Sequence, residues 1–225
     1  MISILIPVYN TEPIFLRSCL ESIERQTFKY YETVVIDNES DNHETIEILN
    51  EYKDNGKINL YTCKRKAGKR NISRALNYGL RKCKYEFVAR MDSDDIMVDD
   101  RLQKQLIYMI SNPEVDICGG QVTGQIKTRH KEFIDQDEYK KSKWFMNHPT
   151  IMYKKTKILD LGGYDEKPEF CPEDFLLWTR ALKNNLILRN MQEILLYYRI
   201  HDNNLSAKDM QKDEWQKAIK KASEQ

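Results

Sequence analysis

The chain has 225 residues, of which 40% are hydrophobic and 32% charged, a composition typical of one ordinary globular domain with a sizeable core. Its 36 basic and 35 acidic side chains give a net charge of +1, which argues against nucleic-acid binding because that function normally needs a basic surplus. No apolar run approaches the ~20 residues that span a bilayer, and we recognise no signal peptide. We therefore expect a cytoplasmic protein, with peripheral membrane association left open.

The first hundred residues alternate between apolar, β-branched runs and segments with helical spacing. This alternation predicts βαβ units and a mainly parallel sheet. Right-handed crossovers would place the C-terminal ends of its strands along one edge, where ligands bind in open α/β sheets. The predicted strands are Ile2–Tyr9, Glu32–Asp37, Lys57–Cys63 and Tyr85–Met91, and the predicted helices are Pro13–Thr27, Asn42–Tyr52 and Arg70–Cys83.

The alternation of strands and helices ends after Asp99, where the pattern predicts short strands and helices in no regular order. The segment 124–143 is polar and receives no assignment. We predict a single α/β domain with a Rossmann-like, mainly parallel central sheet flanked by helices and a smaller mixed region. The predicted helices here are Arg101–Ser111, Lys154–Leu161 and Pro172–Leu182, and the predicted strands are Val115–Cys118, Pro149–Tyr153, Leu186–Leu188 and Ile194–Tyr198.

The most informative segment is the fourth predicted strand, which runs directly into Asp92-Ser93-Asp94-Asp95. Alternate side chains of an extended chain point the same way, so Asp92 and Asp94 can converge on one point. Two such carboxylates repel each other unless a hard cation such as Mg²⁺ or Mn²⁺, completed by phosphate oxygens, lies between them. An isolated motif of this kind is more often a solvated acidic loop, but here two other polar clusters end strands at the same predicted edge.

Four other polar features have both a functional and a structural interpretation. Asp37 ends a strand and could bind a nucleobase imide, or it could cap the next helix. The basic, glycine-containing turn 66–71 could bind phosphate at a helix N-terminus, or it could be a solvated loop. Glu173 and Asp174 open a helix, where acids complement the macrodipole, but one of them could also take a proton. His201 could be a third metal ligand, bind phosphate or be structural.

Taken in order, the motifs resemble an inverting glycosyltransferase of family 2 with the GT-A fold. Each motif is weak alone, but together they run through nearly the whole chain, up to about Ser206. The segments that carry the resemblance are Ile4–Asn10, Val34–Asn38, Gly68–Asn71, Ala75–Gly79, Met91–Asp95, Gly162–Asp165, Glu173–Trp178 and Tyr198–His201.

The resemblance implies a role for each matching residue. The donor nucleotide would be held by Pro7, Val8, Tyr9, Asn10, Asp37, Lys69, Arg70, Asn71, Asp92 and Ser93, with Asp37 on the base, most often uracil. Asp94 would bind Mn²⁺ or Mg²⁺ that bridges the diphosphate, with Asp92 and His201 as further candidate ligands. Asp174 would be the general base, and Glu173 beside it would orient the acceptor. Relatives often show Asp-Asp-Gly-Ser where this chain has Asp37-Asn38-Glu39-Ser40, so we expect looser base contacts there.

These residues predict a metal-dependent inverting glycosyltransferase that moves a hexose or N-acetylhexosamine from a nucleotide sugar, most simply a UDP-sugar, to a glycan, lipid or protein acceptor. We expect residues 1–97 to bind the nucleotide sugar, 98–206 to bind the acceptor, and 207–225 to form a C-terminal helical tail. Two alternatives stay open: a catalytically silent nucleotide-sugar-binding module, and an aspartate-nucleophile phosphohydrolase, although that class places its motif after the first strand. A homodimer also stays open.

Overall fold

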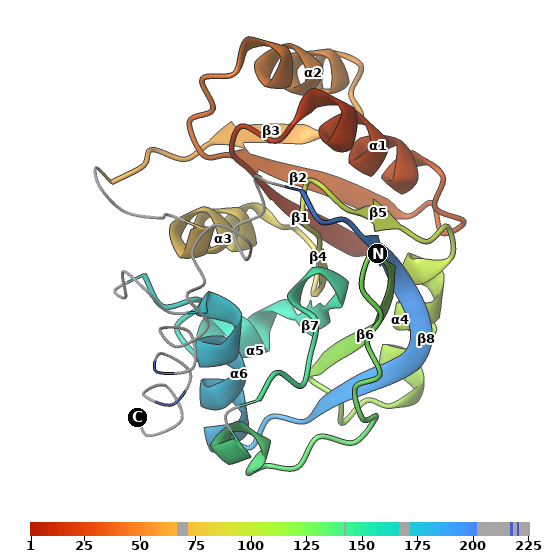
Figure 1. Cartoon of the computed structure of the whole chain (residues 1–225), viewed down its shortest axis with the longest axis vertical. Coiled ribbons are helices and arrows are strands. Elements are labelled where there is room, and N and C mark those ends of the chain that lie inside the picture. Colours follow the sequence, from red (N-terminus) through yellow and green to blue (C-terminus); the bar gives the residue numbers. More distant parts are fainter. Residues whose placement is uncertain (67–71, 142, 167–171, 202–216, 218–219, 221–225) are drawn as a thin grey trace.

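The computed structural model describes residues 1–66, 72–141, 143–166, 172–201, 217 and 220. Its described strands form one eight-stranded sheet in the order β3-β2-β1-β4-β7-β6-β8-β5 (Figure 1). The strands are β1 (Ile2–Val8), β2 (Tyr31–Asp37), β3 (Asn59–Thr62), β4 (Phe87–Arg90), β5 (Ile96–Met97), β6 (Ile117–Gly124), β7 (Met152–Lys154) and β8 (Leu188–Tyr198). The helices are α1 (Pro13–Glu24), α2 (His43–Asp54), α3 (Ile72–Lys82), α4 (Arg101–Ser111), α5 (Lys155–Asp160) and α6 (Glu173–Lys183), with 3₁₀ turns η1 (Glu138–Lys141) and η2 (His148–Thr150).

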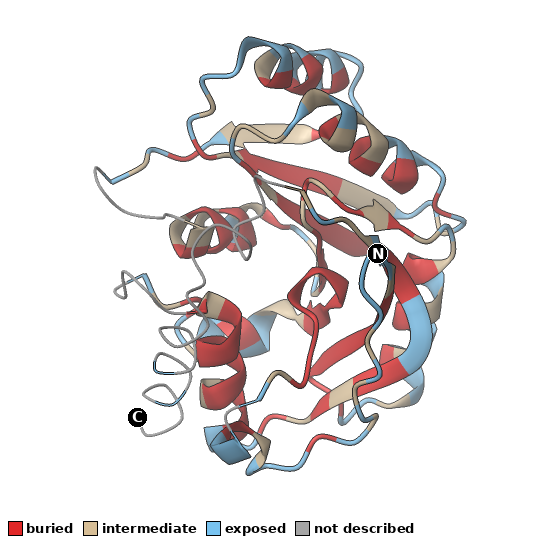
Figure 2. Ribbon diagram, viewed as in Figure 1, coloured by how far each residue is buried: buried red, intermediate tan, exposed pale blue. Residues whose placement is uncertain are grey.

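The first four strands pair in parallel, as the alternation of strands and helices predicts. Their residues are apolar on both faces because helices cover both sides of the sheet (Figure 2). One face packs against α1 and α2, and the other packs against α3. Gly79 lets α3 approach β1 closely, since a Cβ at this position would lie 2.2 Å from Cδ1 of Leu5. The Rossmann-like half therefore agrees with the sequence prediction.

The second half makes the sheet mixed rather than parallel throughout. β7 runs antiparallel to β4, β6 runs antiparallel to β7, and β8 returns parallel to β6. The sequence predicts two strands, Leu186–Leu188 and Ile194–Tyr198, where the structure has the single strand β8. Its register against β6 shifts between Gly119 and Val122, and three exposed residues, 192–194, interrupt the apolar pattern there. The two-residue strand β5 is too short for a sequence pattern to indicate.

One buried arginine connects the two halves. Arg101 of α4 is fully buried and donates hydrogen bonds to the carbonyls of Arg90 at 2.8 Å, Pro149 at 2.8 Å and Ile151 at 3.2 Å. Burial lowers the pKa of Arg101 to about 9. These bonds fix the end of β4 against the segment that contains η2.

Among the described residues, the helices are all too short or too polar to cross a membrane.

Candidate active site

Three aspartates gather directly after β4. A carboxylate oxygen of each of Asp92, Asp94 and Asp95 lies within 4.8 Å of those of the other two. Asp92 and Asp94 converge as predicted, and Asp95, which alternation would point away from them, joins the cluster because the chain turns at this point. In the described part of the chain, the buried Oδ2 atom of Asp95 has no hydrogen-bond partner. A set of three hard oxygen donors with one unpaired oxygen fits a divalent cation.

The segment after β8 folds back onto this acidic cluster. The Arg199 N–H donates to Oδ1 of Asp95 at 2.9 Å, and Nε2 of His201 lies 2.9 Å from Oδ2 of Asp94. The His201 ring also contacts the ring of Phe15, with centroids 4.8 Å apart. Burial and then the neighbouring aspartates raise the pKa of Asp95 to about 9, and the same causes raise the pKa of Asp94. His201 thus reaches the cluster through Asp94, and its role as a metal ligand stays a prediction.

The loop after β1 joins the same site. Oγ1 of Thr11 and Oγ of Ser93 are 2.6 Å apart, which places this loop beside the aspartates. Asn10 has a left-handed backbone conformation, with φ of 47°. Its side chain donates to Asp41 at 2.6 Å and accepts the N–H groups of Asp41 and Asn42. The structure therefore gives Asn10 a supporting role, because its amide holds the loop after β2 in place.

The end of β2 places Asp37 at the same edge of the sheet. Oδ1 of Asp37 accepts the N–H of Ser40 at 3.0 Å, which stabilises the turn. The N-cap of α2 is Asn42, whose side chain accepts the N–H of Thr45 at 3.0 Å. Helix capping is therefore not the role of Asp37, whose carboxylate lies at a strand end and stabilises the turn that follows.

The other predicted nucleotide-binding residues on β1 differ in accessibility. Tyr9 is 45% exposed, and the guanidinium of Arg65 lies 3.8 Å above its ring. Arg65 also donates its N–H to Glu39, which has a positive φ of 57°. Pro7 is partly buried, whereas the side chain of Val8 packs in the core. Val8 can therefore face a ligand only through its backbone.

The second acidic cluster opens α6. Asp174 is 6% exposed, and its carboxylate accepts the N–H of Phe175 at 2.7 Å. Burial, followed by the charge of Glu173, raises the pKa of Asp174 well above its usual range. Burial also acts to raise the pKa of Glu173, but the bond from His148 and the charge of Arg90 outweigh it and lower that pKa. The pair is thus split into one ionised carboxylate and one with a high proton affinity, a pattern typical of acid–base sites.

Arg90 lies within electrostatic reach of both acidic clusters. Its Nη2 atom is 2.6 Å from Oδ1 of Asp92, and the side chain is only 2% exposed. The same positive charge contributes to the lowered pKa of Glu173 and partly opposes the rise in the pKa of Asp174. Within the described residues, Nε and Nη1 of Arg90 have no hydrogen-bond partner. Arg90 therefore links electrostatically two clusters that are separated by about eighty positions in the sequence.

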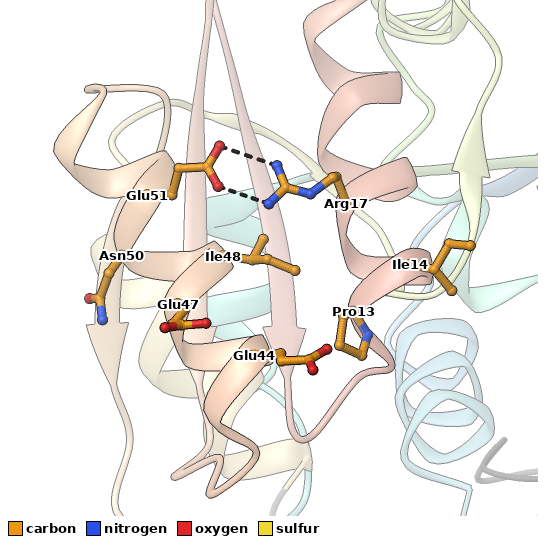
Figure 3. A pocket seen from close by; sticks show the side chains of 8 residues that line it. All are labelled: Pro13, Ile14, Arg17, Glu44, Glu47, Ile48, Asn50 and Glu51. Atoms are coloured by element: carbon orange, nitrogen blue, oxygen red, sulfur yellow. Dashed lines mark hydrogen bonds and ion pairs between the residues drawn. The ribbon is translucent and has the colours of Figure 1, made fainter.

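The remaining candidate features are a basic turn and a surface groove. The predicted phosphate-contacting residues Lys69, Arg70 and Asn71 fall outside the described residues. A surface groove of about 710 Å³ lies between α1 and α2, where Arg17 and Glu51 form a two-bond ion pair (Figure 3). None of the described residues that the sequence predicts as site residues lines this groove. We therefore assign the candidate site to the strand ends and α6.

Comparison with known proteins identifies the family of this chain. Residues 3–184 match the family model described as glycosyl transferase family 2. The chain belongs to glycosyltransferase family 2. Among curated relatives of this family, an O-antigen biosynthesis glycosyltransferase (WbnJ) from Escherichia coli is 35% identical, over 90% of this chain and 80% of the relative. An uncharacterized glycosyltransferase from Haemophilus influenzae is 30% identical, over 95% of this chain and 82% of the relative.

Solved structures of other glycosyltransferases share the GT-A fold with this family 2 chain. S. aureus TarS 1-349 in complex with UDP-GlcNAc has a TM-score of 0.73 and 20% identity, covering 93% of this chain and 61% of that one. The mannosyltransferase PcManGT from Pyrobaculum calidifontis, in complex with GDP-Man and Mn²⁺, has a TM-score of 0.68 and 16% identity, covering 92% and 59%. The chain thus spans less than two thirds of each of these two solved chains. Likeness at this identity establishes the GT-A fold that the sequence predicts.

Proposed function

We propose that this chain is a metal-dependent inverting glycosyltransferase that moves a hexose or N-acetylhexosamine from a UDP-sugar to an acceptor hydroxyl. The observation that carries the proposal is the pair of acidic clusters around Arg90, one suited to a cation and one to a proton. The UDP-GlcNAc complex of TarS supports the choice of nucleotide, and the Mn²⁺ in the PcManGT complex supports the choice of metal.

On the donor side, the aspartates after β4 would hold the cation and the strand ends would hold the nucleotide. Mn²⁺ or Mg²⁺ bound by Asp92, Asp94 and Asp95 supplies neutralisation of the leaving diphosphate. The carboxylate of Asp37 accepts the imide N–H of uracil, and the exposed ring of Tyr9 offers a face for stacking on the base. These contacts fix the anomeric carbon in front of α6.

On the acceptor side, Asp174 takes the proton of the attacking hydroxyl. The hydroxyl oxygen forms a bond to the anomeric carbon while the bond to the diphosphate oxygen breaks on the opposite face, so an α-linked donor gives a β-linked product. General-base catalysis of this kind contributes roughly 10²–10⁴ in rate. The ionised Glu173 orients the acceptor by accepting a hydrogen bond from a neighbouring hydroxyl.

The acceptor is a glycan or a lipid-linked sugar. An E. coli relative, 29% identical over 88% of this chain and 73% of its own length, is named as a UDP-Gal:alpha-D-GlcNAc-diphosphoundecaprenol beta-1,3-galactosyltransferase. In this proposal, residues 1–97 bind the donor and 98–206 bind the acceptor, since the aspartates after β4 and the helix α6 come from these two parts. Family membership disfavours a phosphohydrolase, and the silent module is distinguished by turnover.

The test combines binding and turnover in the same preparation. UDP and UDP-sugars should raise the melting temperature more with Mn²⁺ than with EDTA, because ligands that bind the folded state stabilise it by mass action. Asp94→Asn should lose this metal-dependent part, whereas Asp99→Asn, at an exposed ion pair with Arg25, should keep it. Equal shifts with and without Mn²⁺ would contradict the metal site. Binding without any transfer or slow hydrolysis of the UDP-sugar would identify a silent module.

A further inference from the structure

A buried histidine that the sequence gives no role lies directly against the second acidic cluster. His148 begins η2 and is 6% exposed. Its Nδ1 atom lies 3.3 Å from Oε1 of Glu173, and its Nε2 atom lies 3.1 Å from the hydroxyl of Tyr164. The ring also packs edge-on against Trp178, with centroids 5.8 Å apart. Both ring nitrogens therefore have a partner, and one of those partners is a residue of the proposed site.

Tyr164, the partner of Nε2, is itself held firmly by α3. Asn77 accepts the backbone N–H of Tyr164 at 2.7 Å and donates to its carbonyl at 2.8 Å. The preceding Gly163 has φ of 74°, and a Cβ there would lie 2.4 Å from Oδ1 of Asn77. The Gly162–Asp165 and Ala75–Gly79 motifs, which have no role in the donor or acceptor assignments above, thus serve to place one tyrosine hydroxyl against His148.

The charges on these groups set the direction of each hydrogen bond. Burial, followed by the charge of Arg90, lowers the pKa of His148, so its imidazole is neutral near pH 7 and has a single N–H. The ionised Glu173 can only accept, so this N–H must be on Nδ1. Nε2 is then an acceptor, and Tyr164 donates its O–H to it. The order of donors is therefore Tyr164 to His148 to Glu173.

We propose that His148, with its tautomer fixed by Tyr164, is a positioning residue that holds the Glu173 carboxylate in the orientation that receives the acceptor. This inference rests on the proposed function, in which Glu173 contacts the acceptor. The histidine acts on a carboxylate in the same way that outer partners orient the ligands of a metal. Donor binding does not depend on it, because its bonds end at Glu173.

Three variants separate the bond from the packing of the ring. His148→Phe keeps an aromatic ring but removes the donor to Glu173. His148→Asn places an amide N–H close to the position of Nδ1 and so restores the donor. Tyr164→Phe leaves the His148 ring in place but removes the hydroxyl that fixes the tautomer of that ring. His43→Gln is the matched control, since His43 is exposed and pairs with Glu47 on the surface of α2.

Transfer kinetics give the first measurement. His148→Phe should lower kcat/KM for the acceptor by roughly 10–100-fold, as removal of an orienting partner typically does, while UDP affinity stays unchanged. His148→Asn should recover most of this loss, and Tyr164→Phe should show a smaller loss in the same direction. The control should match the wild type. Equal acceptor kinetics in His148→Phe and the wild type, or no recovery in His148→Asn when it melts like the wild type, would overturn the proposal.

The second measurement does not need turnover. The protein is labelled with ¹³C at its glutamate carboxyls and titrated by NMR. The signal of Glu173 is assigned as the one that disappears in Glu173→Gln, and its shift with pH reports the titration of Glu173. The groups that face it are His148, Tyr164, Arg90 and, on its own helix, Asp174. Loss of the His148 donor should move the midpoint of this titration to higher pH, and His148→Asn should move it back. An unmoved midpoint in both His148→Phe and Tyr164→Phe would refute the positioning role. Normal titration shifts without any transfer by the wild type would instead refute the proposed function.

Discussion

At the scale of single residues, the site depends on carboxylates whose surroundings differ. Glu173 and Asp174 are neighbours in sequence, yet burial and repulsion raise the pKa of Asp174 while the bond from His148 lowers that of Glu173. A general base works best when its pKa lies close to the working pH, whereas an orienting group must stay charged. The first two residues of one helix thus satisfy both needs.

Removal of the base should affect turnover far more than binding. We expect Asp174→Asn to lower kcat by roughly 10²–10⁴ because the acceptor hydroxyl then has no carboxylate to take its proton. UDP affinity, measured by calorimetry with Mn²⁺, should stay at the wild-type value. Asp160→Asn, an exposed aspartate at the end of α5, is the control. Near-normal turnover in Asp174→Asn would show that another group is the base.

The pH dependence of kcat provides a separate check on the same carboxylate. Only the deprotonated form of Asp174 can act as a base, and its raised pKa moves the acidic limb of the profile to higher pH than an ordinary aspartate would give. Burial is the larger cause and persists in any variant, but the charge of Glu173 is the next. Glu173→Gln should therefore move the acidic limb to lower pH, even though the variant is slower overall. A limb that stays in place or moves to higher pH would contradict this coupling.

At the scale of elements, the close contact between α3 and β1 is the most sensitive packing feature of the donor half. Gly79→Ala places a Cβ 2.2 Å from Cδ1 of Leu5 and 2.8 Å from Cγ1 of Ile36, so the helix must shift. We expect a loss of about 1–3 kcal/mol in the free energy of unfolding, typical of overpacking. Urea unfolding measures it, and the exposed Arg81→Ala on the same helix should change stability by no more than about 0.5 kcal/mol. A fully stable Gly79→Ala would mean that α3 is held loosely.

Sequence patterns predicted the elements of the donor half because its strands are buried on both faces and its helices are amphipathic. The same patterns located Asp92, Asp94 and the acidic start of α6, since strand ends and helix starts are local features. They missed His148, Arg90 and Asp95 as site residues, because the significance of each depends on a partner brought in by the fold. The polar pair Asn147-His148, directly before the predicted strand Pro149–Tyr153, is the one signal that could have indicated His148.

At the scale of the whole molecule, the halves that we propose to bind donor and acceptor are joined across β4 and η2. Arg101 supports this junction with hydrogen bonds to three carbonyls. Arg101→Met would leave these carbonyls without a donor in the core, and each unsatisfied group costs about 1–3 kcal/mol. We expect a loss of roughly 3 kcal/mol or more in urea unfolding. Arg25→Met, which breaks only an exposed ion pair, should cost about 1 kcal/mol at most. Similar losses in both variants would mean that Arg101 does not support the junction.

The pairing between β4 and β7 covers only three residues on each strand, from Phe87 to Ala89 and from Met152 to Lys154. The backbone also joins the part that would hold the nucleotide to the part that would select its recipient through the N–H of Arg90 on the carbonyl of Ile151, the N–H of Lys155 on the carbonyl of Glu86, and the pairing of β5 with β8. The two parts therefore share one continuous sheet. Chimaeras that exchange the second part between family members must preserve these pairings if they are to move recipient specificity without loss of the fold.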